Sequence, residues 1–202
     1  MILSLRGNCG DTISRHVFRH SRFYSFAMVV LLAIGLYTGW LFATRNFHEV
    51  IAGELYRSAQ LRPVDIKKYA GAYHIRSIIN LRGANPDAKW YRDEVAEAAR
   101  LGITHIDFAI SSRKMVTRAE SLQLIALMRN APKPLLIHCE AGANRTSLAT
   151  ALYLAAIKKR NEFESELQLS LIYGHVPLWF LRPFAMDRSF DVMEDDFGYS
   201  KS

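Results

Sequence analysis

The stretch at residues 135–146, LLIHCEAGANRT, places a cysteine directly after an apolar run and an arginine six residues later. Two prolines break the chain just before it, so the apolar residues 135–138 predict a short buried β-strand. The residues from about 145 to 160 predict a long helix. Cys139 is then the first residue of a loop between the carboxyl end of a strand and the start of a helix, which is where open α/β sheets bind ligands.

The same alternation of strands and helices continues through the chain after residue 45. Buried strands rich in β-branched residues are predicted at residues 75–81 and 103–108. Helices are predicted at residues 63–70, closed by Gly71, at 86–101, after the capping box of Thr117 and Glu120, and at 162–173. This pattern predicts an α/β fold with a central, mostly parallel sheet, right-handed crossovers and helices on its faces.

One apolar segment precedes this globular part of the chain. Residues 23–44 contain no charged side chain and lie between Arg22 and Arg45. At about 1.5 Å per residue such a helix reaches roughly 33 Å, enough for a hydrocarbon layer of about 30 Å. A buried core helix and a cleaved signal peptide are the alternatives. We expect a basic tail at residues 1–22, a transmembrane anchor at residues 23–44 and a globular domain at residues 45–202.

The charges on the two sides of this segment predict its orientation. Four arginines precede it with a single acidic residue against them, whereas the charges that follow it nearly cancel. The positive-inside rule places the N-terminus in the cytoplasm and the domain on the other side, which in a bacterium is the periplasm. An arginine-rich, acid-poor N-terminus is also typical of mitochondrial targeting segments, so a mitochondrial membrane is the alternative location.

The composition narrows the classes of partner. A formal charge of +7 suits an anionic partner such as phosphate groups, acidic lipid or nucleic acid, without selecting one of them. The globular part has no basic run interleaved with aromatic residues, so we expect no nucleic acid partner. The two cysteines, Cys9 and Cys139, have neither the pairing nor the spacing of a disulfide framework or a zinc site.

The loop after Cys139 has the features of an anion cradle. Its residues are Glu140, Ala141, Gly142, Ala143 and Asn144. The small side chains in its middle let successive backbone N–H groups point into one bowl, backed by a helix N-terminus that carries about half a positive charge. The same field favours the thiolate form of Cys139. Arg145 adds a planar fork that can bind two oxygens of one phosphate.

The run His138-Cys139-x5-Arg145-Thr146 matches every defined position of H-C-x5-R-[ST], the motif of the cysteine-dependent phosphatases. The chain most resembles the atypical dual-specificity branch of the protein tyrosine phosphatase superfamily, particularly its small bacterial members. It is also similar to them at LYRSAQL (residues 55–61), IINLRG (78–83) and QLSLIYGH (168–175). The resemblance spans residues 54–175 and leaves the apolar segment outside.

This resemblance implies a dual-specificity-phosphatase-like domain at residues 45–202 that hydrolyses phosphomonoesters without a metal or other cofactor. Cys139 would form a phosphocysteine intermediate, while the loop amides and Arg145 bind the phosphate. Thr146 would help the sulfur leave, and His138 would orient the loop and keep Cys139 ionised. The substrate stays open between phosphotyrosine or phosphoserine/threonine proteins and a phospholipid or glycolipid phosphate.

The general acid departs from the family pattern. Members commonly carry an aspartate on the loop that here reads AISSRKMV (residues 109–116), which has no carboxylate. Asp107 is the nearest candidate, although a strand residue can equally be a structural hydrogen-bond acceptor. A catalytically weak phosphate-binding module is therefore the alternative function, and a sulfurtransferase is a third.

Two further arginines have open roles. Arg57 can contact the loop or a substrate phosphate, or it can hold the first segment to the sheet through a salt bridge. Arg82, at the carboxyl end of a predicted strand, can face the site or be structural.

Overall fold

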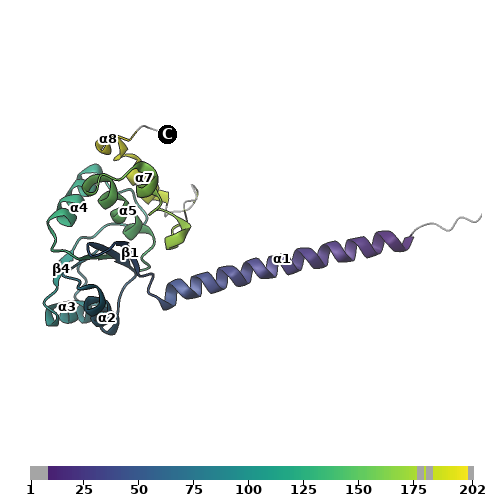
Figure 1. The fold of residues 1–202 in the computed structure, drawn as a ribbon, viewed down its shortest axis with the longest axis horizontal. Helices are drawn as coiled ribbons and strands as arrows, with labels where there is room; N and C mark the ends of the chain where they lie inside the picture. The colour runs from purple at the N-terminus through teal and green to yellow at the C-terminus, as the bar shows by residue number, and fades with distance from the viewer. Residues whose placement is uncertain (1–8, 177–179, 181–183, 200–202) are drawn as a thin grey trace, which may run out of the picture. The chain divides into compact units, whose positions relative to one another are not determined.

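The computed structural model describes residues 9–176, 180 and 184–199, and contacts within the chain divide it into two units, Met1–Trp40 and Leu41–Ser202 (Figure 1). Helix α1 (Cys9–Ala43) contains the whole first unit as far as it is described. Of the predicted basic tail, residues 1–8 lie outside the described residues, and the remainder is helical. The second unit carries all the strands that are described.

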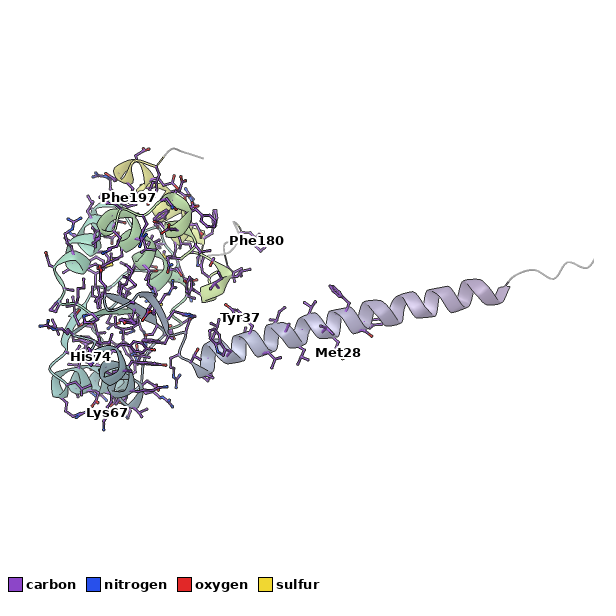
Figure 2. All side chains as sticks on the ribbon, in the orientation of Figure 1. Met28, Tyr37, Lys67, His74, Phe180 and Phe197 are labelled. Carbon is purple, nitrogen blue, oxygen red and sulfur yellow. The ribbon has the colours of Figure 1, made fainter. Side chains whose placement is uncertain are left out.

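Within α1, the stretch Tyr24–Ala43 is long and apolar enough to cross a membrane by length and composition. A signal sequence near an N-terminus passes the same test. No part of the stretch is buried inside the protein, which distinguishes it from a core helix. Figure 2 shows Met28 and Tyr37 projecting from this helix.

The second unit is built on a five-stranded sheet with the order β1-β2-β5-β3-β4. The strands are β1 (His48–Ile51), β2 (Leu55–Ser58), β3 (Ser77–Asn80), β4 (Thr104–Asp107) and β5 (Leu135–His138). Strands β2, β5, β3 and β4 run parallel, and β1 joins β2 as an antiparallel edge hairpin. The mostly parallel sheet is confirmed, and β5, the strand that leads into Cys139, is its central strand.

Helices cover both faces of this sheet (Figure 1). Because side chains alternate along a strand, Leu55, Ile79 and Ile137 pack into one core while Tyr56, Ile78 and Leu136 pack into the other. The first core is closed by α4 (Arg118–Asn130), α5 (Asn144–Leu152), α7 (Ala185–Asp191) and residues of α8 (Glu194–Phe197). The second is closed by α2 (Pro63–Tyr73) and α3 (Lys89–Arg100).

Three predicted helices differ from the structure. Helix α2 continues past Gly71 to Tyr73 and ends at His74, whose φ of 54° is left-handed. The helix predicted at residues 145–160 is α5 followed by a π-helical turn, η1 (Tyr153–Ile157). The helix predicted at residues 162–173 is wrong. Only α6 (Glu162–Glu166) and a 3₁₀ turn, η2 (Leu171–Tyr173), form there, because the intervening Gln168 turns its carbonyl and side chain to the buried Arg57.

Candidate active site

The loop from Cys139 to Ala143 joins β5 to α5 at the carboxyl edge of the sheet. Gly142 has a φ of +69°, and a Cβ built on it would lie 2.6 Å from the backbone N of Ala59. Only glycine fits this position, because the backbone of the segment after β2 passes directly against it. Cys139 is buried at the base of the loop, among core residues.

Three carbonyl groups of the loop are held from outside. Asn46 Nδ2 donates to Ala141 O (3.1 Å), Gln60 N to Glu140 O (3.1 Å) and Arg57 Nη2 to Gly142 O (3.0 Å). In a planar trans peptide the N–H of the next residue points away from the carbonyl, so the N–H groups of residues 141–143 turn toward the opposite side. Within the described part of the chain none of these three N–H groups donates a hydrogen bond. The loop therefore presents a nest of free donors above Cys139.

The start of α5 adds side-chain donors to this nest. Arg145 Nη1 donates to Leu81 O at 3.3 Å, whereas its Nε is buried with no hydrogen-bond partner among the described residues. Thr146 Oγ1 is likewise buried and without a partner in that part of the chain. Buried donors of this kind normally have a partner, so the arrangement fits an oxyanion bound in the loop. The structure thus places Arg145 and Thr146 at the start of α5, on the loop that begins at Cys139, with His138 at the end of β5.

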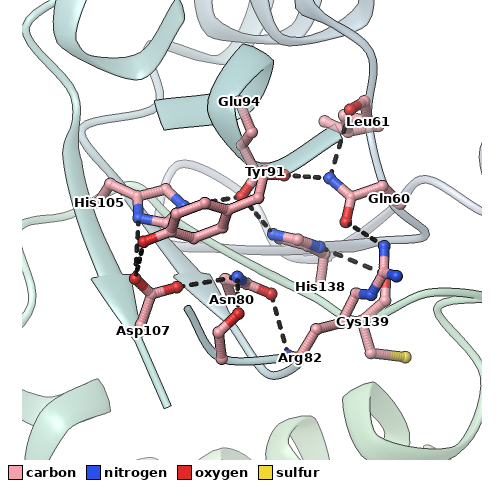
Figure 3. A network of polar contacts seen from close by, with 11 residues as sticks. Gln60, Leu61, Asn80, Arg82, Tyr91, Glu94, His105, Asp107, His138 and Cys139 are labelled. Carbon is pink, nitrogen blue, oxygen red and sulfur yellow. Dashed lines mark hydrogen bonds and ion pairs between the residues drawn. The ribbon is translucent and has the colours of Figure 1, made fainter. Parts of the chain in front are cut away.

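His138 lies behind the loop in a buried polar network (Figure 3). Its Nε2 is 2.9 Å from Glu94 Oε1, and His105 Nε2 is 2.8 Å from the same oxygen. Glu94, on α3, is 1% exposed, and its other oxygen accepts a bond from Gln60. Burial alone would raise the pKa of Glu94, but the charges and hydrogen bonds of His138 and His105 outweigh it and lower that pKa to about 2.

Glu94 is a site-supporting residue that the sequence analysis missed. It lies on α3 three residues after Tyr91 and four before Ala98, a position on the face that packs against the sheet. A charged residue on the buried face of an amphipathic helix was the available clue.

Asp107 is held in the same network at the end away from Cys139 (Figure 3). Its Oδ1 accepts from Asn80 Nδ2 (2.8 Å) and its Oδ2 from Tyr91 OH (2.5 Å). The bond to Asp107, together with burial, raises the pKa of Tyr91 to about 12. The structure does not bring Asp107 to the loop, since β3 separates its strand from β5.

Arg82 lies beside the loop. Its Nη1 donates to Gln60 Oε1 at 2.9 Å, and its Cζ stacks 3.5 Å above the ring of Trp90. Burial lowers the pKa of Arg82 and Arg145 adds to this, whereas the charges of Glu140 and Cys139 oppose it. The Arg82 guanidinium therefore interacts electrostatically with the loop.

Arg57 is completely buried beneath the loop. Besides Gly142 O, its guanidinium donates to Ser147 Oγ (2.7 Å), Thr150 Oγ1 (3.1 Å) and Gln168 Oε1 (2.9 Å), and its Cζ lies 3.9 Å from the Tyr173 ring centre. No carboxylate among the described residues pairs with it, so of the roles left open by the sequence the contact with the loop is observed. Burial lowers the pKa of Arg57 to about 10, although the charges of Tyr173 and Cys139 oppose this.

The model of the tyrosine phosphatase family matches residues 39–163, more than half of the chain and including the whole Cys139 loop. The chain belongs to the tyrosine phosphatase family. It is accordingly a cysteine-dependent phosphatase.

Solved structures share the fold of this phosphatase at low sequence identity. TpbA of P. aeruginosa is 19% identical, with a TM-score of 0.58 over 77% of this chain and 89% of that one. PTPMT1 is 12% identical, with a TM-score of 0.59 over 75% and 96%. The Siw14 catalytic core, a protein of S. cerevisiae, is 18% identical, with a TM-score of 0.57 over 76% and 88%. TpbA has been solved with pTyr and PTPMT1 with PI(5)P, and no curated protein sequence matches the chain.

The phosphatase also braces its loop with residues beyond the matched region. His175 is buried, with Nδ1 2.9 Å from Asn144 Oδ1 and Nε2 2.9 Å from Asp187 Oδ2 on α7. Tyr173 O accepts a 2.9 Å bond from Asn46, the residue that also holds Ala141. The C-terminal segment is thus part of the frame of the site.

Proposed function

We propose that this phosphatase hydrolyses phosphomonoesters in two steps through a phosphocysteine at Cys139. The proposal depends on one set of donors at the Cys139 loop: among the described residues, the N–H groups of residues 141–143 donate no hydrogen bond and the buried Arg145 Nε has no partner. Donors fixed in advance around one point stabilise the charge that develops on a transferring phosphoryl group. Glu140 and Asn144 contribute backbone groups to the same loop, with the Glu140 side chain exposed at its rim.

In the first step the Cys139 sulfur forms a bond to phosphorus as the bond from phosphorus to the ester oxygen breaks, and that oxygen takes a proton from water. In the second, water adds to phosphorus, the sulfur–phosphorus bond breaks and inorganic phosphate leaves. Arg145 pairs with two phosphate oxygens in both steps. The Thr146 hydroxyl donates to the departing sulfur, and His138, fixed by Glu94, positions the strand end that carries Cys139.

Asp107 is the candidate general acid from the sequence, but both of its oxygens already accept hydrogen bonds. We therefore expect Asp107→Asn to lower turnover by less than the roughly 10²-fold typical of losing a general acid. Aryl phosphates need little protonation of the leaving group and would be turned over fastest.

The test compares turnover of an aryl phosphate by the full chain in detergent with that of Cys139→Ser. Cys9→Ser is the matched control, since it removes the other cysteine of the sequence. We expect phosphate release by the wild type and by Cys9→Ser, none by Cys139→Ser, and phosphate on Cys139 in acid-quenched protein. If the wild type binds phosphate without releasing product, the alternative holds, a phosphate-binding module, which the lack of a carboxylate at residues 109–116 favours.

A further inference from the structure

The end of the apolar helix belongs to the same unit as the phosphatase loop. The second unit begins at Leu41, so the last three residues of the stretch Tyr24–Ala43 are part of it. A tight turn follows, in which Asn46 N donates to Leu41 O at 2.7 Å and Arg45 and Asn46 adopt left-handed φ values of 57° and 47°. The turn between the helix end and β1 is thus part of the second unit.

This turn is bonded directly to the loop. The buried Asn46 side chain donates to Ala141 O (3.1 Å). The Leu41 side chain lies over Gly174, where an added Cβ would be 3.3 Å from Leu41 Cδ1 and 3.8 Å from Ala143 Cβ. The end of the helix and the loop above Cys139 are therefore packed around the same residues.

Chain length bounds how far the loop lies from the helix end, whatever direction the helix takes. Asn46 follows Ala43 by three residues, which extend over at most about 11 Å. The headgroup layer on each side of a bilayer is about 5–8 Å thick, half the difference between the whole bilayer and its hydrocarbon core. With Tyr24–Ala43 in a membrane, the loop would lie at or just above the headgroups.

Two apolar side chains near the loop are exposed. Leu171 and Ile172, on the turn η2, are 61% and 53% exposed. The next two residues of the chain are Tyr173, which is bonded to Asn46, and Gly174, which lies against Leu41. Exposed apolar side chains at this position fit the boundary between headgroups and acyl chains.

We propose that the substrate is a lipid whose headgroup is a phosphomonoester, hydrolysed in the same bilayer that holds the helix. This inference rests on the proposed function and adds the substrate class. A lipid phosphate at headgroup depth reaches the loop by lateral diffusion, at the high effective concentration that tethering gives. A phosphate on a soluble protein does not share this tether.

The experiment uses the full chain reconstituted in phosphatidylcholine vesicles that contain phosphatidic acid. Phosphate release is compared with that from a mixture in which protein and phosphatidic acid are in separate vesicles, and with a soluble phosphotyrosyl peptide at equal total phosphate. We expect the shared vesicles to react at least about tenfold faster than the separate ones. Equal rates in shared and separate vesicles, or faster turnover of the peptide, would overturn the proposal.

A matched pair of variants tests the apolar surface. Ile172→Gln should lower the ratio of lipid to aryl phosphate turnover several-fold, whereas Val192→Gln, at a position 51% exposed and far along the chain from the loop, should leave this ratio unchanged. Equal ratios in both variants would contradict a membrane contact at η2. Turnover of the aryl phosphate separates failure of the proposed function from failure of the substrate class. If the wild type does not hydrolyse the aryl phosphate, the proposed function is wrong. If it hydrolyses the aryl phosphate but shows no preference for the lipid, only the substrate class is wrong.

Discussion

Replacing the buried Arg57 by methionine should separate the frame of the loop from its chemistry. Methionine keeps the unbranched apolar part of arginine but donates no hydrogen bond, so Gly142 O and Ser147 Oγ lose the partners that hold them at 3.0 and 2.7 Å. Each buried polar group left without a partner costs about 1–3 kcal/mol of stability. Part of this cost is offset, because the variant no longer buries the arginine charge. We expect a net loss of about 2–4 kcal/mol in the free energy of unfolding.

The effect on catalysis follows from the position of the loop. A reacting group displaced by about 1 Å can slow a reaction about 10²-fold, so kcat/KM for an aryl phosphate should fall by about this factor in Arg57→Met. Arg57→Lys keeps the charge but not the planar fork, and its loss should be smaller. Arg129→Met, which removes an exposed arginine of α4, is the control and should match the wild type.

A folded Arg57→Met protein with wild-type kcat/KM for the aryl phosphate would refute the reasoning, because Gly142 O and Ser147 Oγ would then hold the loop without their partner.

Two other predictions concern residues that hold the loop. Folding lowers the pKa of Glu94 to about 2. The ionised Glu94 therefore stabilises the folded state at any pH above the ordinary carboxylate pKa, and this stabilisation is lost as the pH falls toward 2. Glu94→Gln should lower the free energy of unfolding at pH 7, measured in urea titrations, by about 3 kcal/mol. The stability of this variant should also decline less as the pH is lowered. If it declines as steeply as that of the wild type, the pairing of Glu94 with His138 is contradicted. Gly142→Ala should abolish phosphate binding measured by calorimetry, because the added Cβ would lie 2.6 Å from Ala59 N. The control is Gly71→Ala, which has open space in α2 and should gain up to about 1 kcal/mol of stability. A Gly142→Ala protein that binds phosphate normally would contradict the close approach of the two backbone segments.

The sequence by itself determined the local parts of the phosphatase. The apolar run at residues 135–138 and the capping box of Thr117 and Glu120 each specify their own backbone, and both form as predicted. Parallel strands then follow from the alternation of strands and helices. The family also followed from one short motif, since the chemistry needs its cysteine and arginine at a fixed spacing.

Only the tertiary structure decided what holds the loop and where its neighbours point. Asn46 reaches Ala141 across 95 residues of sequence, Arg57 reaches Gln168 across 111, and Glu94 reaches His138 across 44. Such pairs leave no periodic pattern in the sequence, because each depends on the packing of elements that are distant in the chain. The same holds for Asp107: its position in the sequence suggested an acid, whereas its bonds to Asn80 and Tyr91 arise only once β3, β4 and α3 have packed together.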